Sequence, residues 1–151
     1  LYKERLQKII EYANLCSKKY STPIKMLKFG RTIQAIKQHS LSLKNIELIP
    51  LMGYKDFVRA QQDSLFIISD SGTAQEEPAL LKIPVIVPRD FTERPESVEN
   101  NCSFMLSLKS QHNWDLSFEW ISTCKEKISD SWLSSSEKTS HKIVKILEKI
   151  I

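Results

Sequence analysis

The segment 68-ISDSGTAQEEPALLKIPVIVPRDFTERPE-96 shows how this chain of 151 residues is organised. An apolar run, 65–68, stops at the polar residues 69–73, and a second apolar run, 85–87, is followed by the charged residues 89–96. Short apolar runs without alternation are typical of strands buried on both faces of a parallel sheet. We therefore expect polar loops to follow directly after buried strands.

Strand-like and helix-like segments alternate on either side of this segment. Strands are expected at 24–29, 46–49, 65–68, 85–87 and 104–106, and helices from the start to about 17, at 32–39, 54–61, 74–81, shortly before 100, at 114–128 and at 138–150. Such alternation predicts stacked βα units, which form an α/β domain with a parallel sheet covered by helices on both faces.

The composition is that of an ordinary globular protein of a single domain, 1–151. The apolar fraction is 41%, the charged fraction is 26%, and the net charge of +4 comes from 22 basic and 18 acidic residues. This balance is too mild and too mixed to indicate a nucleic-acid partner. No apolar run approaches the roughly 20 residues of a membrane span, so we expect no membrane partner.

The cysteines favour a reducing, cytoplasmic location. Cys16, Cys102 and Cys124 are odd in number and far apart, which fits neither a disulfide framework nor a zinc site. We expect no bound metal and no cofactor. The first residue, Leu1, already lies in a helical pattern, which indicates a piece cut from something longer.

The loop after the third strand has the features of a phosphate site. Ligands of open parallel sheets bind at the carboxyl ends of the strands, where Asp70 to Thr73 are expected. Gly72 allows a close backbone approach and an otherwise strained turn, while Ser71 and Thr73 add hydroxyls. The start of the next helix has free N–H groups and a partial positive charge.

A purely structural interpretation of the same loop is also open. Thr73 and Glu76 match the T-x-x-E capping box, which needs no ligand. Glu77 is then spare, and its carboxylate is placed to accept hydrogen bonds from a ribose diol. Pro78 removes an N–H near the start of the helix, so we expect a loosened first turn.

The loop after the fourth strand is dense in charge. Its charged residues are Arg89, Asp90, Glu93, Arg94 and Glu96. One interpretation is a solvated loop with surface ion pairs of little energetic value. In the other, the two strands are neighbours and Arg94 faces the 71–73 turn, where its planar donors suit a diphosphate.

Both loops together resemble the non-hydrolysing UDP-N-acetylglucosamine 2-epimerases. The stretch DSGTAQEEPALLKIPVIVPRDFTERPESVE is similar to that family's D-S-G-G-x-Q-E-E, K-P-V and R-x-x-T-E-R-P-E motifs, and IELIPLMGYKDFV is similar to its segment ending P-L-x-Y-x-x-F. The resemblance implies a Rossmann-like domain that corresponds to the carboxyl-terminal half of a GT-B fold. It also implies a UDP-sugar partner, a homodimeric full-length protein, and a final helix, about 138–150, that crosses to a missing amino-terminal domain.

The resemblance implies a role for each candidate residue. Ser71, Gly72 and Thr73 would contact the diphosphate, and Glu77 would bind the ribose hydroxyls. Arg94, the candidate catalytic residue, would lie near the diphosphate and the reacting sugar. Met52 and Phe57 would border the uracil, and Phe57 is equally expected to belong to the helix core.

The family's reaction inverts carbon 2 of the sugar by expelling UDP, which gives a glycal, and adding it back after protonation from the other face. The acids and bases belong to the amino-terminal half and to a histidine- and arginine-rich loop, and these 151 residues contain neither. This half alone is therefore expected to be inactive. Two departures from the family pattern stand out: Thr73 replaces a glycine, and Phe29-Gly30 replaces a histidine-proline pair.

Two other functions are consistent with a nucleotide-binding α/β domain. One is the donor half of a GT-B glycosyltransferase, which would lack the T-E-R-P-E motif that this chain has at 92–96. The other is a sugar-nucleotide-binding module without catalysis.

Overall fold

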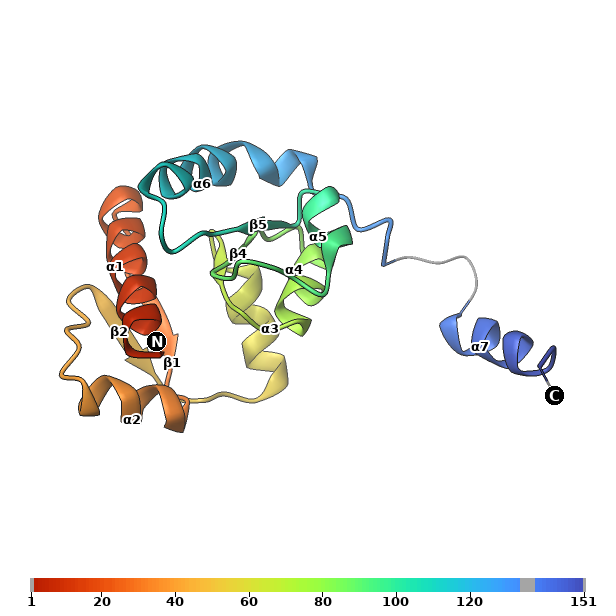
Figure 1. Cartoon of the computed structure of the whole chain (residues 1–151), viewed down its shortest axis with the longest axis horizontal. Coiled ribbons are helices and arrows are strands. Elements are labelled where there is room, and N and C mark those ends of the chain that lie inside the picture. The colour runs from red at the N-terminus through yellow and green to blue at the C-terminus, as the bar shows by residue number, and fades with distance from the viewer. Residues whose placement is uncertain (1, 134–137, 151) are drawn as a thin grey trace.

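The computed structural model describes residues 2–133 and 138–150. Strands and helices alternate along the chain, as Figure 1 shows. The strands are β1 (Ile24–Leu27), β2 (Ile46–Ile49), β3 (Ile67–Ile68), β4 (Val85–Val87) and β5 (Ser103–Met105). The helices are α1 (Tyr2–Tyr20), α2 (Gly30–Gln38), α3 (Tyr54–Gln62), η1 (Thr73–Gln75), α4 (Glu77–Leu80), α5 (Pro95–Glu99), α6 (Gln111–Cys124), η2 (Lys125–Lys127) and α7 (Thr139–Leu147), where η denotes a 3₁₀ turn.

All strand pairs in the described residues are parallel, as expected, but they form separate hydrogen-bonded groups. β1 pairs with β2, and β4 pairs with both β3 and β5. Ile24 of β1 and Ile68 of β3 each pack against both of the larger apolar clusters. Apolar packing, rather than a hydrogen-bond ladder, therefore joins the strand groups.

Helix α1 is the element that both apolar clusters share. Leu6, Ile10 and Ala13 pack with residues of α2 and β2. Tyr12 and Cys16, on an adjoining face, pack with residues of β4 and α6. The buried Tyr12 hydroxyl lies 2.7 Å from Ser117 Oγ of α6. The apolar spacing predicted the first face but not the second.

Burial of the strands differs from the expectation for 65–68. β4 is fully buried, with Val85, Ile86 and Val87 each 0% exposed. Leu65, however, is 49% exposed and stands outside β3, which spans only Ile67–Ile68. The other residues of the run, Phe66, Ile67 and Ile68, are only half-buried. The expectation that the run is buried on both faces is therefore wrong, and β3 lies at the edge of its three-stranded group.

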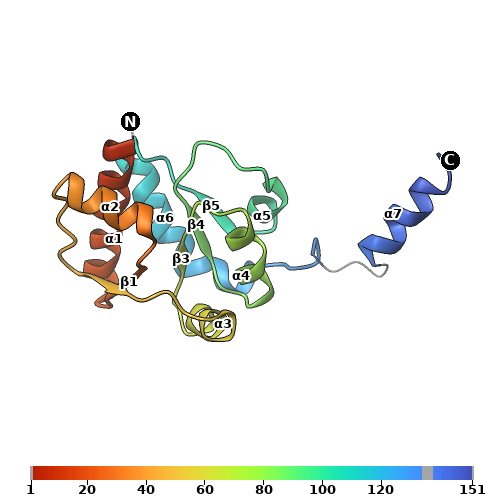
Figure 2. The same cartoon turned by 90° about the horizontal axis from the view of Figure 1, so that it is seen from below.

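The described chain stays on the body of the domain as far as Leu133, since Trp132 and Leu133 pack against Ala79, Cys102 and Ile128. Lys82 Nζ donates to Asp130 Oδ1 at 2.7 Å and to the Ile128 carbonyl at 3.3 Å, which fixes the end of the α6–η2 segment. Helix α7 lies apart from the other elements in both ribbon views (Figures 1 and 2). Its described apolar side chains are at least half exposed: Ile143, Val144, Ile146 and Leu147.

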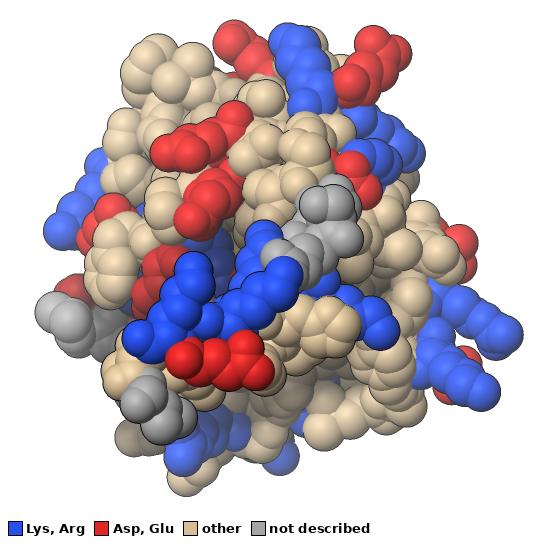
Figure 3. All heavy atoms as spheres, turned by 90° about the vertical axis from the view of Figure 1, so that its right-hand side faces the viewer, with Lys and Arg blue, Asp and Glu red and all other residues tan. Residues whose placement is uncertain are grey.

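The surface carries mixed charge. On the face drawn in Figure 3, lysine and arginine side chains are interspersed with aspartate and glutamate. None of the described helices combines the length and apolarity that a membrane span requires.

Candidate functional site

Two loops meet at the carboxyl ends of β3 and β4. Ile67 is paired with Val85 and Ile68 with Ile86, so the strands end side by side. The first loop, 69–76, contains η1 and leads into α4, and the second, 88–97, includes the start of α5. This edge is where open parallel sheets bind ligands.

The Arg94 side chain reaches across to the first loop. A Cβ placed on Gly72 would lie 3.7 Å from Arg94 Nη2, which is ordinary van der Waals contact. Arg94 Nε donates to Glu76 Oε1, and Nη1 donates to the Glu93 carbonyl at 3.1 Å. The guanidinium is thus held at Nε and Nη1, while Nη2 faces Gly72.

Hydrogen-bond donors gather beside that guanidinium. The hydroxyls of Ser71 and Thr73 lie 3.0 Å apart and share one hydrogen bond. Along this turn, Gln75 is the first residue whose backbone N–H donates to a backbone carbonyl, that of Gly72. The N–H groups of Gly72, Thr73 and Ala74 donate to no acceptor among the described residues, as expected at a helical start. Free N–H groups, hydroxyls and a guanidinium can together bind an anion.

The capping-box interpretation is wrong. No side chain caps η1 or α4, and the Glu76 carboxylate bonds to Arg94 instead of the backbone near Thr73. Both groups of the bond to Arg94 are charged, so Coulomb attraction adds to the hydrogen bond. The Thr73 hydroxyl bonds to Ser71.

The helix after this loop is broken, as Pro78 predicted. A 3₁₀ turn, Thr73–Gln75, and an α-helix of four residues, Glu77–Leu80, are separated by Glu76. Such short pieces carry little of the partial charge of a long helix, so local N–H groups and Arg94 supply the positive potential. Gly72 has φ −61°, so the expected strained turn is wrong. Its missing side chain leaves room beside Arg94 instead.

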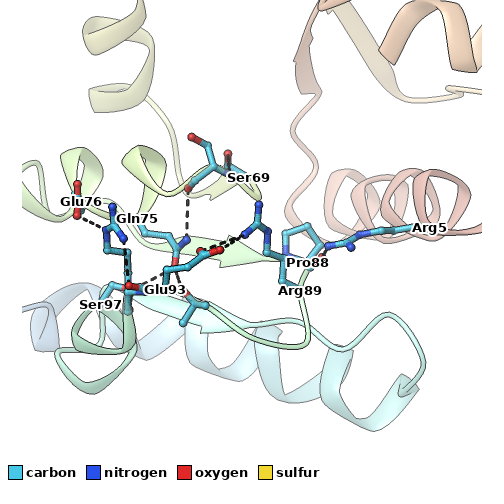
Figure 4. Close-up of polar contacts among 11 residues, drawn as sticks. Arg5, Ser69, Gln75, Glu76, Pro88, Arg89, Glu93 and Ser97 are labelled. Carbon is cyan, nitrogen blue, oxygen red and sulfur yellow. Dashed lines mark hydrogen bonds and ion pairs between the residues drawn. The ribbon is translucent and has the colours of Figure 1, made fainter. Parts of the chain in front are cut away.

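Gln75 is a residue of the site to which sequence reasoning gave no role. It is 0% exposed, and its side chain lies between the first and second loops, as Figure 4 shows. Its Oε1 accepts from Thr92 Oγ1 at 2.6 Å, and its Nε2 donates to the Ser71 carbonyl at 3.5 Å. No local signal marked it as buried, because Gln75 is followed directly by the acidic pair Glu76-Glu77.

The remaining predicted residues lie on other segments of the chain. Glu77 begins α4 and is half-buried, one residue beyond the Glu76–Arg94 pair. Met52 lies in the loop after β2, and Phe57 lies in the first turn of α3; both are half-buried. The structure thus brings Arg94 beside Gly72, whose neighbours Ser71 and Thr73 are hydrogen-bonded to each other. It places Met52 and Phe57 on separate segments.

An open polar hollow adjoins the first loop on the side of α1. It has a volume of about 280 Å³ and is lined by Arg5, Asp70, Arg89, Asp90 and Phe91. Arg5 Nη2 donates to the Pro88 carbonyl at 2.6 Å and ties α1 to the start of the second loop. Arg89 Nη1 lies 3.3 Å from Glu93 Oε2 in the same loop.

The cysteines are unsuited to nucleophilic chemistry. Burial raises the pKa of the Cys16 thiol to about 12 and that of Cys124 to about 11. Burial also raises the pKa of Cys102. Since the thiolate is the reactive form, these cysteines pack as small apolar residues near neutral pH. Within the described ranges, no three metal-ligating side chains gather in one place.

Comparison with known proteins places these loops in context. Residues 2–148 match the family model described as UDP-N-acetylglucosamine 2-epimerase. The chain belongs to the UDP-N-acetylglucosamine 2-epimerase family. The epimerase of Methanocaldococcus jannaschii is 36% identical over 109 residues, which cover 69% of this chain and 30% of that protein.

Solved structures of family members share the fold. The M. jannaschii epimerase in complex with UDP-GlcNAc and UDP superposes with a TM-score of 0.81 at 30% identity, covering 97% of this chain and 41% of that one. The Neisseria meningitidis epimerase bound to UDP-GlcNAc gives 0.64 at 29% identity, again covering 97% and 41%. The expected α/β fold, the Rossmann-like half of a GT-B epimerase, is confirmed. The chain spans about a third of the length of the curated relatives that it matches.

Proposed function

We propose that this chain is the nucleotide-binding half of a UDP-N-acetylglucosamine 2-epimerase, which interconverts UDP-GlcNAc and UDP-ManNAc or a related UDP-2-acetamido sugar pair. In this proposal Ser71, Gly72 and Thr73 contact the diphosphate and Glu77 binds the ribose. The observation that carries it is the position of Arg94 Nη2 beside Gly72, which brings the two motif loops together. Family membership over residues 2–148 supports it.

The uracil end of the proposed site rests on Met52 and Phe57. Both follow the carboxyl end of β2 along the chain, as the phosphate loops follow β3 and β4. Their half-buried apolar side chains offer a surface for a flat base. The nucleotide would then extend along the edge of the sheet, with Glu77 and Arg94 at the ribose and diphosphate.

The chemistry of the proposed reaction depends on charge stabilisation. Carbon 2 of the sugar is not flanked by a carbonyl, so its hydrogen becomes removable only as UDP is expelled. Negative charge then builds up on the departing diphosphate. Preorganised donors aimed at developing charge are the most effective form of such stabilisation. Arg94 Nη2, the free N–H groups of the 72–74 turn and the paired hydroxyls of Ser71 and Thr73 would supply it.

The acids and bases of the reaction would come from an amino-terminal domain of the same protein. We propose that α7 packs against that domain. The support is the exposed apolar set on α7 (Ile143, Val144, Ile146 and Leu147), because contiguous exposed apolar residues are unusual unless they are covered by another surface.

The proposed activity is tested by proton NMR on the protein translated from the whole reading frame. Incubated with UDP-GlcNAc in heavy water, it should exchange the hydrogen on carbon 2 and form the epimer. A variant carrying Arg94→Ala is the matched control and should exchange far more slowly. A whole protein that binds UDP-GlcNAc without any carbon-2 exchange contradicts the proposed reaction and favours a binding module.

A further inference from the structure

Gln75 is a fully buried amide whose polar atoms both have partners on the loops of the site. Buried polar groups are nearly always hydrogen-bonded, because an unpaired one is costly. Here the partners lie on either side: the Ser71 carbonyl in the first loop and Thr92 Oγ1 in the second. Gln75 therefore bridges the two loops from within the protein.

The direction of each hydrogen bond follows from the chemistry of the groups. The Arg94 N–H lies 3.0 Å from Thr92 Oγ1 and can only donate. The Thr92 hydroxyl accepts that bond and gives its single proton to Gln75 Oε1 at 2.6 Å. The amide nitrogen of Gln75 is thus turned to the Ser71 carbonyl, and a continuous chain runs from the first loop to the backbone of Arg94.

Arg94 is held at its other polar groups too. Its carbonyl accepts from Ser97 Oγ at 2.8 Å, and its Nε donates to Glu76, the residue after Gln75. Consecutive residues of the first loop therefore fix both the main chain and the side chain of Arg94. Nη2 is left facing Gly72.

We infer that Gln75 and Thr92 form a clamp that positions Arg94 over Gly72 and so sets the affinity for the diphosphate. This inference rests on the proposed function, since it takes the ligand to be a nucleoside diphosphate. Gln75 and Thr92 are positioning residues: the Gln75 side chain is 0% exposed and does not meet a ligand itself. The clamp fixes the guanidinium before binding, which lowers the ordering cost of binding.

The test compares Thr92→Val with Thr92→Ser. Valine keeps the shape of threonine but removes the hydroxyl, which breaks the bonds to Gln75 and to the Arg94 N–H. Serine keeps the hydroxyl. UDP affinity is measured by calorimetry, uridine affinity by ligand-observed NMR, and folding by circular dichroism. Thr92→Ala provides the same deletion if valine does not fold.

Thr92→Val should weaken UDP binding about tenfold, the effect of losing one or two net hydrogen bonds, and leave uridine binding unchanged. Thr92→Ser should bind UDP as the unchanged chain does. In the Arg94→Ala background, Thr92→Val should have no further effect on UDP binding, because the group that it positions is gone.

Other outcomes overturn the inference. If the unchanged chain binds UDP and Thr92→Val binds it equally well, the clamp does not set the affinity, while the proposed function stands. An equal loss of UDP and uridine binding, or a full Thr92→Val effect without Arg94, means a general structural role. If the unchanged chain binds neither UDP nor uridine, the proposed function fails and the inference fails with it.

Discussion

The phosphate loops and helix α7 are opposite kinds of surface on one chain. In the loops, polar side chains that are far apart in sequence form hydrogen bonds with one another. Glu76 and Arg94 are 18 residues apart, and Gln75 and Thr92 are 17 residues apart. In α7, apolar side chains lie exposed, with Ile146 at 57%. The side chains of the loops find polar partners within the chain, whereas the described apolar side chains of α7 are at least half exposed. The difference indicates that contacts within the chain fix the loops, while α7 gains little stability from burial in the described chain.

The largest expected effect comes from deleting a core side chain beneath the loops. Ile86 is 0% exposed in β4, the strand that carries the second loop. Ile86→Ala should lower the free energy of unfolding by about 2–5 kcal/mol, since it loses burial and leaves a cavity. Urea unfolding measures this. A loss below 1 kcal/mol would mean that β4 is not the centre of the core.

The next effect concerns binding rather than stability. Arg94→Ala should weaken UDP binding roughly tenfold to a hundredfold, because a charged hydrogen-bond donor to the diphosphate is lost. Lys127→Ala in η2 removes one positive charge away from the loops and is the matched control. Calorimetry gives both affinities, and equal effects of the two substitutions would reduce Arg94 to a contribution of net charge.

A smaller effect should appear with pH. Cys16 has a pKa of about 12 in the fold, raised mainly by burial from an ordinary value of 9.0. A raised pKa stabilises the fold below 9, and this stability is lost as pH rises toward 12. Unfolding free energy should therefore fall by about 1 kcal/mol from pH 9 to 10 through this group. Cys16→Ala should flatten that slope; an unchanged slope would assign it to other residues.

The smallest effect is expected in α7. Ile146→Ala should change the stability of this chain by no more than about 0.5 kcal/mol, since the side chain is already exposed. The contrast with Ile86→Ala sharpens the comparison, because both remove the same atoms. In the protein translated from the whole reading frame, Ile146→Ala should cost more than it does here. Equal, small losses in both proteins would leave α7 without an apolar partner.

How far the sequence predicted the site depended on the range of the interaction. Asp70 to Thr73 and the 88–96 loop were placed correctly, because strand ends follow from apolar runs and Pro or Gly boundaries. The contact of Arg94 with the first loop was predicted from the neighbouring strands and is confirmed in position. The role of Glu76 was predicted wrongly, since a local capping pattern competes with a partner 18 residues away.

The sequence by itself determined the order of strands and helices, the limits of β2 and β4, and the family to which the chain belongs. These follow from apolar periodicity and from motifs read over a few residues. Only the tertiary structure decided that Gln75 is buried between the loops, that α1 serves both apolar clusters and that Glu76 pairs with Arg94. The physical reason is that a polar side chain forms a hydrogen bond with whichever group folding brings within about 3 Å. A local sequence pattern does not specify which distant residue that will be.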